Sequence, residues 1–303
     1  MSLISIITVN FNQPDATLDL LKSIAEYESR FTLEIIVIDN GSKQDPESTF
    51  LAAHPEILYI RSEKNLGFAG GNNLGIKAAA GDLLFLVNND TEFRPELIER
   101  LADTLIQQPK VGIISPKILY YDDPDVIQYA GFTPMNYYTC RNHCIGQFEQ
   151  DKGQYDHIVG ETGYIHGAAM MITRRALEAA GPMAENFFLY YEEMDWCERV
   201  SKAGFEIWVN TNAVILHKES LSVGKNSALK EYFMNRNRIL FIRRNAGLLQ
   251  KAFFITYFMS FVAPRNIIKY FREGNASFCK VLLRAITWNF THSKSSQELG
   301  YKL

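Results

Sequence analysis

The stretch LLFLVNND, residues 83–90, decides how we interpret the fold of this chain. Its first five residues are all apolar, which indicates a buried strand. The polar residues Asn88, Asn89 and Asp90 follow at once, where such a strand would leave the sheet. Ligands of open α/β sheets bind at the carboxyl ends of the strands, and a carboxylate beside two amides can hold a divalent cation. An ordinary turn is the alternative, because Asn and Asp side chains bond the local backbone.

Strand-like and helix-like segments alternate on the amino-terminal side of this stretch. We predict strands over residues 4–9, 34–38 and 57–60, each followed by a helical segment. This alternation predicts a mostly parallel α/β sheet flanked by helices. The strand ends Asn10-Phe11-Asn12 and Asp39-Asn40-Gly41-Ser42 would then lie beside residues 88–90 at one edge of the sheet. Three polar strand ends at one edge indicate a ligand crevice better than three unrelated turns.

The glycine-rich segment NLGFAGGNNLG, residues 65–75, precedes the strand at 83–87. It has neither the G-x-G-x-x-G order of a dinucleotide site nor the Gly-Lys-Ser/Thr of a phosphate-binding P-loop. Glycines and a helix amino terminus still allow close approach to phosphate or sugar hydroxyls. A flexible turn that starts a helix is an equally good interpretation.

A second polar cluster lies in the segment FFLYYEEMDWCER, residues 187–199. Glu192, Glu193, Asp195 and Glu198 fall within seven residues beside an aromatic run. Partial burial raises the pKa of a carboxyl group, so one of these acids is a candidate general base. Acids also favour a helix amino terminus, and their helical spacing lets only some of them face one pocket. His217 follows the predicted strands 205–209 and 213–216, and could be structural or a ligand.

The carboxyl-terminal part of the chain differs in charge from the rest. The whole chain carries a net charge of -3, but the part from Lys218 onward has 15 Lys and Arg against 4 Asp and Glu. A basic region on an acidic body indicates an anionic partner, such as a membrane surface or phosphates. The apolar run at 252–264 is bounded by Lys251 and Arg265 and is shorter than the roughly 20 residues of a membrane span. It predicts an interfacial helix, with a buried helix as the alternative.

Composition and cysteine content narrow the class of protein. Of the 303 residues, 47% are hydrophobic and 21% are charged, which is typical of a folded globular chain. The four cysteines are too few for a disulfide framework in a chain of this length. The amino terminus shows no basic segment of a secretion signal, so we expect a cytoplasmic protein with reduced thiols.

Taken in order, these segments resemble family 2 glycosyltransferases with a GT-A fold, especially the rhamnosyltransferase-like branch. The resemblance covers roughly residues 4–245 and rests on six motifs, each weak alone but specific in this order. The motifs are Thr8-Val9-Asn10-Phe11-Asn12, Asp39-Asn40-Gly41-Ser42, Asn65-Leu66-Gly67-Phe68-Ala69-Gly70-Gly71-Asn72, Asn88-Asn89-Asp90-Thr91, Phe188-Leu189-Tyr190-Tyr191-Glu192-Glu193-Met194-Asp195, and His217.

The resemblance implies a role for each motif. Asp39 would read the nucleobase or ribose of the donor, and Asn88 and Asp90 occupy the family's Asp-x-Asp positions at a diphosphate-bound metal, although Asn88 replaces its first acid. His217 matches a family metal ligand, and Glu193 matches the catalytic base. The family's Glu-Asp pair is Glu192-Glu193 here. The expected donor-binding residues are Thr8, Asn10, Asn12, Asp39, Asn65, Gly67, Gly70, Gly71, Asn72, Asn88 and Asn89. The expected metal ligands are Asp90, His217 and Asn88, and the expected catalytic residues are Glu193, Glu192 and Asp195.

We therefore expect an inverting glycosyltransferase that uses Mn²⁺ or Mg²⁺, with a GT-A domain over residues 1–230 and a basic amphipathic helical region over 231–303. The donor-binding half would cover about 1–115 and the acceptor side about 116–230. The expected partners are a nucleotide-diphospho-sugar, with rhamnose as a candidate sugar, and a glycan or lipid-linked acceptor in surface polysaccharide synthesis. No nucleic acid is expected. The protein would be peripheral to the inner face of the cell membrane.

Two other classes of protein remain open from the sequence. A nucleotidyltransferase would also use an α/β sheet and a metal, but Asn10-Phe11-Asn12-Gln13 is not its usual basic glycine-rich loop. A non-catalytic nucleotide-sugar-binding protein is the other alternative, because Asn88 stands where the family has an acid.

Overall fold

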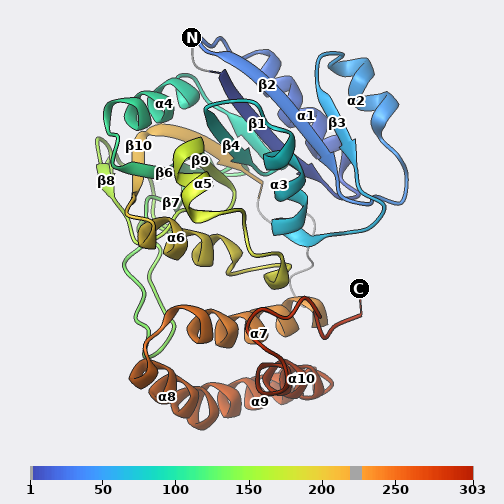
Figure 1. Cartoon of the computed structure of the whole chain (residues 1–303), viewed down its shortest axis with the longest axis vertical. Coiled ribbons are helices and arrows are strands. Elements are labelled where there is room, and N and C mark those ends of the chain that lie inside the picture. The colour runs from blue at the N-terminus through green and yellow to red at the C-terminus, as the bar shows by residue number, and fades with distance from the viewer. Residues whose placement is uncertain (1–2, 219–226, 303) are drawn as a thin grey trace.

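The computed structural model describes residues 3–218 and 227–302, and its strands form a single mixed sheet (Figure 1). The strand order is β3-β2-β1-β4-β9-β6-β10-β5, with β7 paired to β6 and β8 paired to β10. The strands are β1 (Leu3–Asn10), β2 (Thr32–Asp39), β3 (Leu58–Arg61), β4 (Leu83–Val87), β5 (Thr91–Phe93), β6 (Val111–Tyr120), β7 (Ile127–Tyr129), β8 (Val159–Glu161), β9 (Ala169–Thr173) and β10 (Glu206–His217). The helices around the sheet are α1 (Pro14–Ala25), α2 (Glu47–Ala53), α3 (Gly67–Ala78), α4 (Leu97–Gln107), α5 (Arg174–Ala180), the short η1 (Glu185–Phe187) and α6 (Glu192–Lys202).

The amino-terminal half of the sheet is parallel, as the sequence predicts. Strand β1 pairs in parallel with β2 on one side and β4 on the other, and Asn10 lies opposite Asp39. The apolar run at residues 83–87 is β4, and all five of its residues are buried. The polar ends of β1, β2 and β4 therefore meet at one edge of the sheet.

The other half of the sheet is mixed and brings distant residues to that edge. Strand β9 runs antiparallel to β4 and β6, while β10 is parallel to β6 and antiparallel to the short β5. The register of β5 and β10 places Thr91 opposite His217. The two strands predicted at 205–209 and 213–216 are one strand, with an irregularity between Asn210 and Val214.

The glycine-rich segment is mostly helix and not loop, because α3 begins at Gly67. A Cβ atom added at Gly75 would lie 2.3 Å from Ile7 Cγ2, and one at Gly71 would lie 2.8 Å from Val9 Cγ1. Both neighbours belong to β1, so these glycines let α3 pack closely on the sheet. Of the two interpretations of this segment, the structure shows the helix start, and the donor-binding role of Gly71 stays a prediction.

The sequence has no regular period over residues 120–155 and suggests a long excursion with a small hairpin, and in the structure this excursion folds back on the sheet. Strand β7 pairs antiparallel with β6, and antiparallel bridges join Phe132 to Cys144 and Asn136 to Arg141. This arrangement agrees with the small hairpin that the sequence suggests. All four cysteines, two of which lie in this excursion, are free thiols.

The carboxyl-terminal helices form a layer of their own below the sheet unit (Figure 1). They are α7 (Ala228–Asn245), α8 (Leu248–Tyr257), the π-helical turn η2 (Phe258–Val262), α9 (Ala263–Arg272) and α10 (Phe278–Thr291). The π turn precedes Pro264, whose missing N–H cannot bond the preceding turn. The predicted domain boundary at residues 230–231 falls in the first turn of α7.

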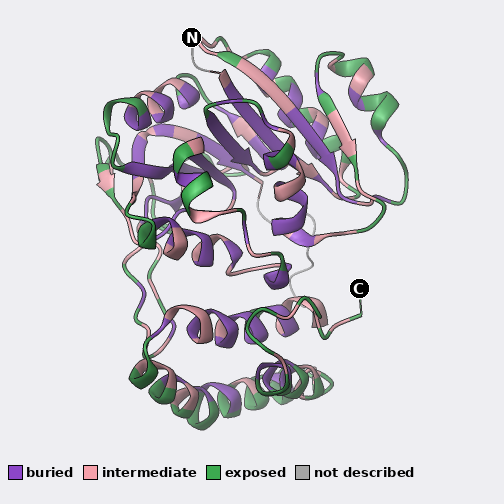
Figure 2. Ribbon diagram, viewed as in Figure 1, coloured by how far each residue is buried: buried purple, intermediate pink, exposed green. Residues whose placement is uncertain are grey.

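The apolar run at 252–264 is helical and has two different faces. Phe254, Phe258 and Val262 are buried against the other helices of the layer, whereas Phe253 and Phe261 are exposed. The outer surface of this layer is largely exposed in Figure 2. None of the helices in the described part of the chain has the length and apolar character needed to cross a membrane.

Candidate active site

Asp39 lies at the carboxyl edge of the sheet and is held by its neighbours. Asn10 Nδ2 donates hydrogen bonds to Asp39 Oδ1 at 2.8 Å and to Ser42 Oγ at 3.2 Å. The backbone N–H of Ser42 donates to Asp39 Oδ2 at 3.2 Å, and Arg61 Nε lies 3.6 Å from the same oxygen. Asn10 and Asp39 are fully buried. The structure thus brings together two of the predicted donor-binding residues in one polar network.

Other predicted donor-binding residues line the loops of the same edge. Asn12 has a φ of +55° and joins two loops, because its N–H donates to Ser42 Oγ and its Oδ1 accepts from Lys43 N–H. Asn65 Oδ1 accepts from the N–H of Gly67, where α3 begins. The hydroxyl of Thr8 is buried without a hydrogen-bond partner among the described residues. These residues shape the edge next to Asp39.

Three further predicted donor-binding residues, Gly70, Asn72 and Asn89, make contacts within the fold. Gly70 is a helical residue whose added Cβ would lie 2.6 Å from Leu66 Cβ. Asn72 Nδ2 donates to the carbonyl of Phe68 one helical turn earlier. Asn89 Nδ2 donates to Thr17 Oγ1 on α1 at 3.0 Å. Their spacing in the sequence could not distinguish packing from ligand contact.

Asn40 is a structural residue of this edge that the sequence interpretation passed over. Its Nδ2 donates to the carbonyl of Gly67 at 3.0 Å, and its Oδ1 accepts from the N–H of Leu66 at 3.0 Å. Asn40 therefore fixes the start of α3 against the end of β2. Its place directly after Asp39 in the second motif was the available signal.

Asp90 and His217 lie together, as predicted for metal ligands. His217 Nε2 is 3.2 Å from Asp90 Oδ1, and both residues are buried. Neither atom has a hydrogen-bond partner among the described residues. On the other side of the ring, His217 Nδ1 lies 2.7 Å from Gln128 Oε1 on β7. An Nδ1–H that donates to Gln128 leaves the Nε2 lone pair facing the carboxylate, which is the arrangement of a metal-binding histidine.

Asn88, the third predicted ligand, is fixed through its backbone. Its N–H donates to the carbonyl of Ala168 at 2.9 Å, and its carbonyl accepts from Thr91 Oγ1 at 2.8 Å. No third His, Cys, Asp or Glu completes a metal cluster with Asp90 and His217 among residues 3–218 and 227–302. Within the described residues, Asp90 and His217 are thus the two such side chains that a cation could use here.

Gln128 and His166 are site residues that the sequence interpretation missed. The His166 ring lies 6.1 Å from the His217 ring, and its Nδ1 accepts from the N–H of Ala168 at 3.1 Å. Burial, with a smaller effect of His217, lowers the pKa of His166 to about 3, so this ring is neutral. Neither residue belongs to a recognisable motif, because Gln128 lies in the excursion and His166 precedes an apolar strand.

The acid pair Glu192-Glu193 forms the first turn of α6, where a helix favours negative charge. Burial nevertheless raises the pKa of Glu193 to about 7. Burial, and then the charge of Glu193, raise the pKa of Glu192 well above its usual value. A Cβ atom added at Gly167 would lie 3.9 Å from Glu193 Cγ and 3.8 Å from Phe68 Cζ. Gly167 follows His166 directly, so the acid pair and the Asp90–His217 pair border the same region.

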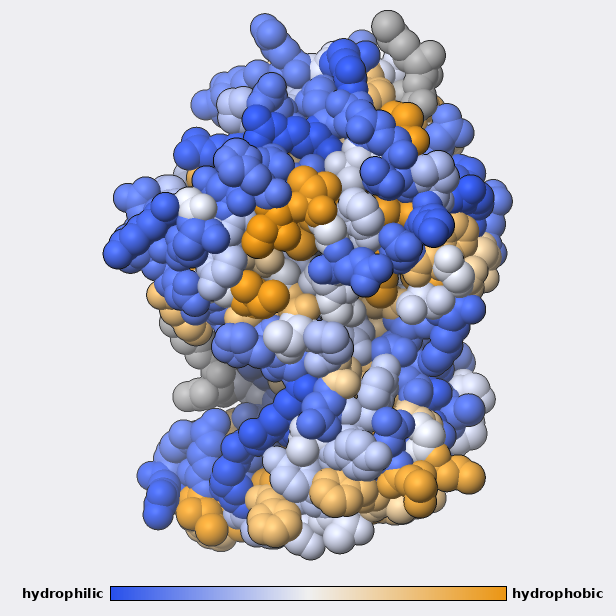
Figure 3. All heavy atoms as spheres, turned by 90° about the vertical axis from the view of Figure 1, so that its left-hand side faces the viewer, coloured by the Kyte–Doolittle hydropathy of each residue, from blue (hydrophilic) through white to orange (hydrophobic). Residues whose placement is uncertain are grey.

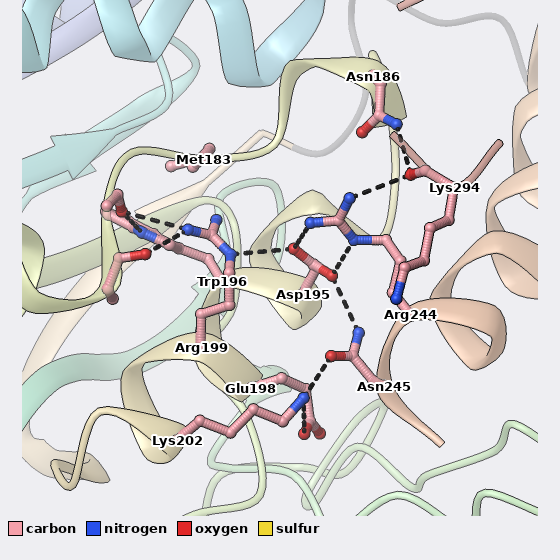
Figure 4. Close-up of polar contacts among 12 residues, drawn as sticks. Met183, Asn186, Asp195, Trp196, Glu198, Arg199, Lys202, Arg244, Asn245 and Lys294 are labelled. Carbon is pink, nitrogen blue, oxygen red and sulfur yellow. Dashed lines mark hydrogen bonds and ion pairs between the residues drawn. The ribbon is translucent and has the colours of Figure 1, made fainter. Parts of the chain in front are cut away.

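Asp195, the third predicted catalytic acid, is fully engaged elsewhere (Figure 4). Arg244 Nε and Asn245 Nδ2 on α7 donate to its Oδ1 at 2.8 and 2.9 Å. Arg199 Nε and Arg244 Nη2 donate to its Oδ2 at 3.1 and 3.2 Å. Glu198 also faces away from the pair, because its carboxylate accepts from Tyr164 Oη at 2.6 Å. Only part of the acidic cluster faces the site, as the helical spacing predicts.

Three comparisons with known proteins show which family and fold this chain has. Residues 5–180 match the family model described as glycosyl transferase family 2. The chain is 29% identical over 242 residues to the low-salt glycan biosynthesis hexosyltransferase Agl10 of Haloferax volcanii. This match covers 78% of this chain and 74% of that protein. It is 24% identical over 216 residues to an N-acetylglucosaminyl-diphospho-decaprenol L-rhamnosyltransferase of Mycobacterium tuberculosis, over 65% of this chain and 70% of that protein.

Among solved structures, the mannosyltransferase PcManGT from Pyrobaculum calidifontis in complex with GDP-Man and Mn²⁺ is similar in fold. The TM-score is 0.56 at 13% sequence identity, and the match covers 95% of this chain and 87% of that chain. The expected GT-A fold, an α/β sheet flanked by helices, is confirmed, but the sheet is mixed and not mostly parallel.

Proposed function

Because this chain belongs to glycosyl transferase family 2, and is a nucleotide-sugar glycosyltransferase, we propose that it is an inverting, metal-dependent enzyme. The observation that carries the proposal is the shared position of two pairs of side chains, of which Glu193 is half-buried and Asp90, His217 and Glu192 are buried. Asp90 and His217 face each other with unpartnered atoms, and Glu192-Glu193 borders the same region through Gly167 and His166. One pair suits a cation, and the other suits proton transfer.

The metal proposal rests on the donor set. A carboxylate oxygen and an imidazole nitrogen are both suitable ligands of Mn²⁺, and Gln128 holds the imidazole in the required orientation. With only two such protein ligands in the described structure, the remaining positions suit the diphosphate of the donor and water. When bound there, a divalent cation would stabilise the charge of the leaving diphosphate as a Lewis acid.

Glu193 is the proposed general base. A base must be ionised to accept a proton, and a pKa of about 7 leaves Glu193 largely ionised just above neutral pH while keeping it basic enough to act. One base at one side of the donor implies direct displacement with inversion at the sugar carbon. Asp195 takes no part in the proposed chemistry, because both of its oxygens are bound by α7 and Arg199.

Asp39 and its network are proposed to bind the nucleoside of the donor. The carboxylate lies at the edge of the parallel strands, which is where open α/β sheets bind nucleotides. Asn10 and Ser42 hold it in place, and the start of α3 lies next to it through Asn40. Rhamnose is the sugar suggested by the name of the rhamnosyltransferase relative, and we propose a deoxythymidine-diphospho-sugar as its donor.

We further propose a lipid-linked acceptor at the inner face of the cell membrane. The carboxyl-terminal helices expose the apolar residues Leu248, Leu249, Phe253, Met259, Phe261, Ile267, Ile268, Phe271, Leu283 and Phe290. Figure 3 shows apolar side chains gathered at the end of the molecule formed by this layer. Arg265, Lys269 and Arg272 line a surface hollow on α9 together with Phe261 and Ile268. Basic and apolar groups on one helix surface suit an anionic lipid surface.

A donor panel tests the proposed reaction. Thermal unfolding is followed with dTDP, UDP and GDP, each with and without Mn²⁺ or Mg²⁺, since a ligand of the folded state raises the apparent stability. We expect a metal-dependent increase with one nucleotide, and release of that nucleoside diphosphate when the matching nucleotide-sugar and an acceptor are added. Release of pyrophosphate would indicate a nucleotidyltransferase. Binding without turnover over several acceptors would indicate a non-catalytic protein.

A further inference from the structure

The segment that leads into the acid pair, residues 187–191, has an unusual backbone. Phe188, Tyr190 and Tyr191 have φ values of +67°, +70° and +74°, in the left-handed region that residues with a side chain rarely adopt. Such conformations persist only where surrounding groups enforce them, and they gather at functional sites. Glu192 follows Tyr191 directly, so the conformation of this segment decides where the acid pair lies.

Asn237 on α7 makes the contacts that enforce this conformation. Its Nδ2 lies within hydrogen-bond distance of the carbonyls of Phe187 at 2.8 Å, Leu189 at 2.7 Å and Tyr190 at 2.9 Å, so its two hydrogens are shared among three acceptors. Its Oδ1 accepts from Arg236 Nε at 2.8 Å, which fixes the orientation of the amide. Asn237 is fully buried, so no water can replace these bonds.

Arg236 secures the same contact from the neighbouring position. Its guanidinium donates to the carbonyl of Asn186 and to the carbonyl of Leu299 at 2.9 Å. It also lies over the rings of Phe233 and Trp288, at 5.1 and 4.4 Å from their centroids. Arg236 is fully buried as well, so Asn237 extends from a rigid part of α7.

The opposite side of the segment touches the helix that borders the donor site. The N–H of Phe68 on α3 donates to the carbonyl of Phe188 at 2.8 Å. Gly67 is in close contact with the same carbonyl, because an added Cβ would lie 2.2 Å from that oxygen. Residues 187–190 are thus held between α3 and α7, and α7 belongs to the carboxyl-terminal layer.

We propose that Asn237 is a positioning residue for sugar transfer, whose amide sets the conformation of residues 187–190 and thereby the position of Glu192-Glu193. The inference rests on the proposed function, in which Glu193 is the base. The Asp195 contacts with Arg244 and Asn245 are a second link between α6 and the same helix (Figure 4). The carboxyl-terminal layer is therefore part of the catalytic apparatus as well as a candidate membrane contact.

The test compares Asn237→Ala with Asn235→Ala. Asn235 is a matched control on the same helix, since it is buried and its amide bonds Glu231 and Asn266, which both belong to the carboxyl-terminal helices. Transfer is measured with the nucleotide-sugar that the donor panel selects, alongside binding of the matching nucleoside diphosphate. For Asn237→Ala we expect kcat to fall about tenfold or more, because a small displacement of a catalytic group is costly. Its donor KM and nucleotide affinity should stay within about twofold of the wild type, since the donor contacts are unchanged.

The outcomes separate this inference from the proposed function. Full activity of Glu193→Gln would overturn the base assignment on which both rest. An inactive Glu193→Gln variant together with an unchanged kcat for Asn237→Ala would overturn the positioning role alone. Equal losses of kcat in Asn237→Ala and Asn235→Ala would do the same. If Asn237→Ala does not fold, Asn237→Ser, which keeps one donor, is judged by the same criteria. Loss of folding in both variants would also overturn the proposal, because the contact would then serve stability only.

Discussion

Asp90 Oδ1 and His217 Nε2 lie 3.2 Å apart at the buried edge of the sheet, and neither has a hydrogen-bond partner among the described residues. Two unpartnered, electron-rich atoms at this distance repel each other unless a cation or a proton lies between them. We expect Asp90→Asn and His217→Ala to abolish the metal-dependent part of nucleotide binding. The measurement is the thermal shift with the selected nucleoside diphosphate, with and without Mn²⁺. Metal-dependent shifts that match the wild type in both variants would rule out this pair as the metal site.

Gln128 should affect the metal affinity of the Asp90–His217 site without contacting the nucleotide. Its Oε1 lies 2.7 Å from His217 Nδ1 and fixes the ring that would bind the metal. Loss of such an outer partner typically weakens metal affinity by about 10- to 100-fold. We expect this loss in Gln128→Ala, measured as the Mn²⁺ concentration needed for half-maximal transfer. Gln154→Ala is the control, because Gln154 is exposed in the same excursion and bonds Gln150 and Glu149. Equal Mn²⁺ requirements in the two variants would contradict the prediction.

Glu193→Gln should keep donor binding and lose transfer, since the amide cannot accept the proton of the acceptor hydroxyl. In the wild type, the rate should rise with pH through an apparent pKa of about 7, because burial raises the pKa of Glu193 to that value. This apparent pKa describes the pair Glu192-Glu193 and not one residue, since the charges of the two carboxyl groups affect each other. A pH-independent rate between about pH 5 and 9 would argue against a carboxyl base in this range.

The same raised pKa predicts that Glu193→Gln is more stable than the wild type at alkaline pH. In the unfolded chain a Glu carboxyl group has a pKa of about 4.3 and ionises at a lower pH than it does in the folded chain. As the pH rises between these two pKa values, ionisation therefore favours the unfolded chain, and the folded protein loses stability. The penalty is absent well below pH 4 and complete above about 7. The gain in melting temperature of Glu193→Gln should therefore be larger at pH 8 than at pH 5. An equal gain at both values would mean that Glu193 is not buried as an acid.

The polar strand ends could be predicted from the sequence because a parallel sheet leaves little freedom. Once β1, β2 and β4 are parallel, Asn10, Asp39 and Asp90 must lie at one edge. His217 could be added only through the resemblance, because its approach to Asp90 depends on the antiparallel pairing of β5 with β10. That pairing joins residues far apart in the chain, and β5 is too short to be visible as a pattern.

The residues that the sequence did not reveal act through tertiary contacts. Gln128 and Asn237 have no local signal, since each is defined by the group that it touches on a distant element. The glycine-rich segment left two interpretations open for a different reason. The spacing of its glycines is typical of a ligand loop, yet Gly71 and Gly75 allow α3 to approach β1. The glycines in the sequence show that small residues are needed in this segment. They do not show whether a ligand or another part of the protein lies against them.

Gly167→Ala should impair transfer with little effect on folding. The added methyl group would be 3.9 Å from Glu193 Cγ and 3.8 Å from Phe68 Cζ, which are ordinary contact distances. It would add volume between the proposed base and Phe68 on α3, where we expect the acceptor hydroxyl to approach. We expect a lower kcat/KM for the acceptor and a melting temperature close to that of the wild type. Gly160→Ala is the control, because a Cβ there meets no atom within 4 Å. Identical acceptor kinetics in the two variants would place the acceptor elsewhere.

Membrane attachment should depend on both the charge and the apolar surface of α9. Arg265, Lys269 and Arg272 are exposed beside Phe261 and Phe271, and the structure describes no helix that could span a bilayer. A basic residue near an anionic surface contributes about 1 kcal/mol, so neutralising all three with Gln should weaken binding by roughly 100-fold. The measurement is cosedimentation with vesicles of phosphatidylglycerol and phosphatidylcholine.

The control for that experiment replaces three exposed lysines of the sheet unit, Lys22, Lys77 and Lys110, with Gln. This variant loses the same charge but should bind the vesicles like the wild type. Phe261→Ser with Phe271→Ser should weaken binding even at high salt, because the apolar contribution is not screened. If both triple-Gln variants lost binding equally, the attraction would depend on net charge and not on α9. If the paired Phe variant bound normally, α9 would lie outside the lipid interface.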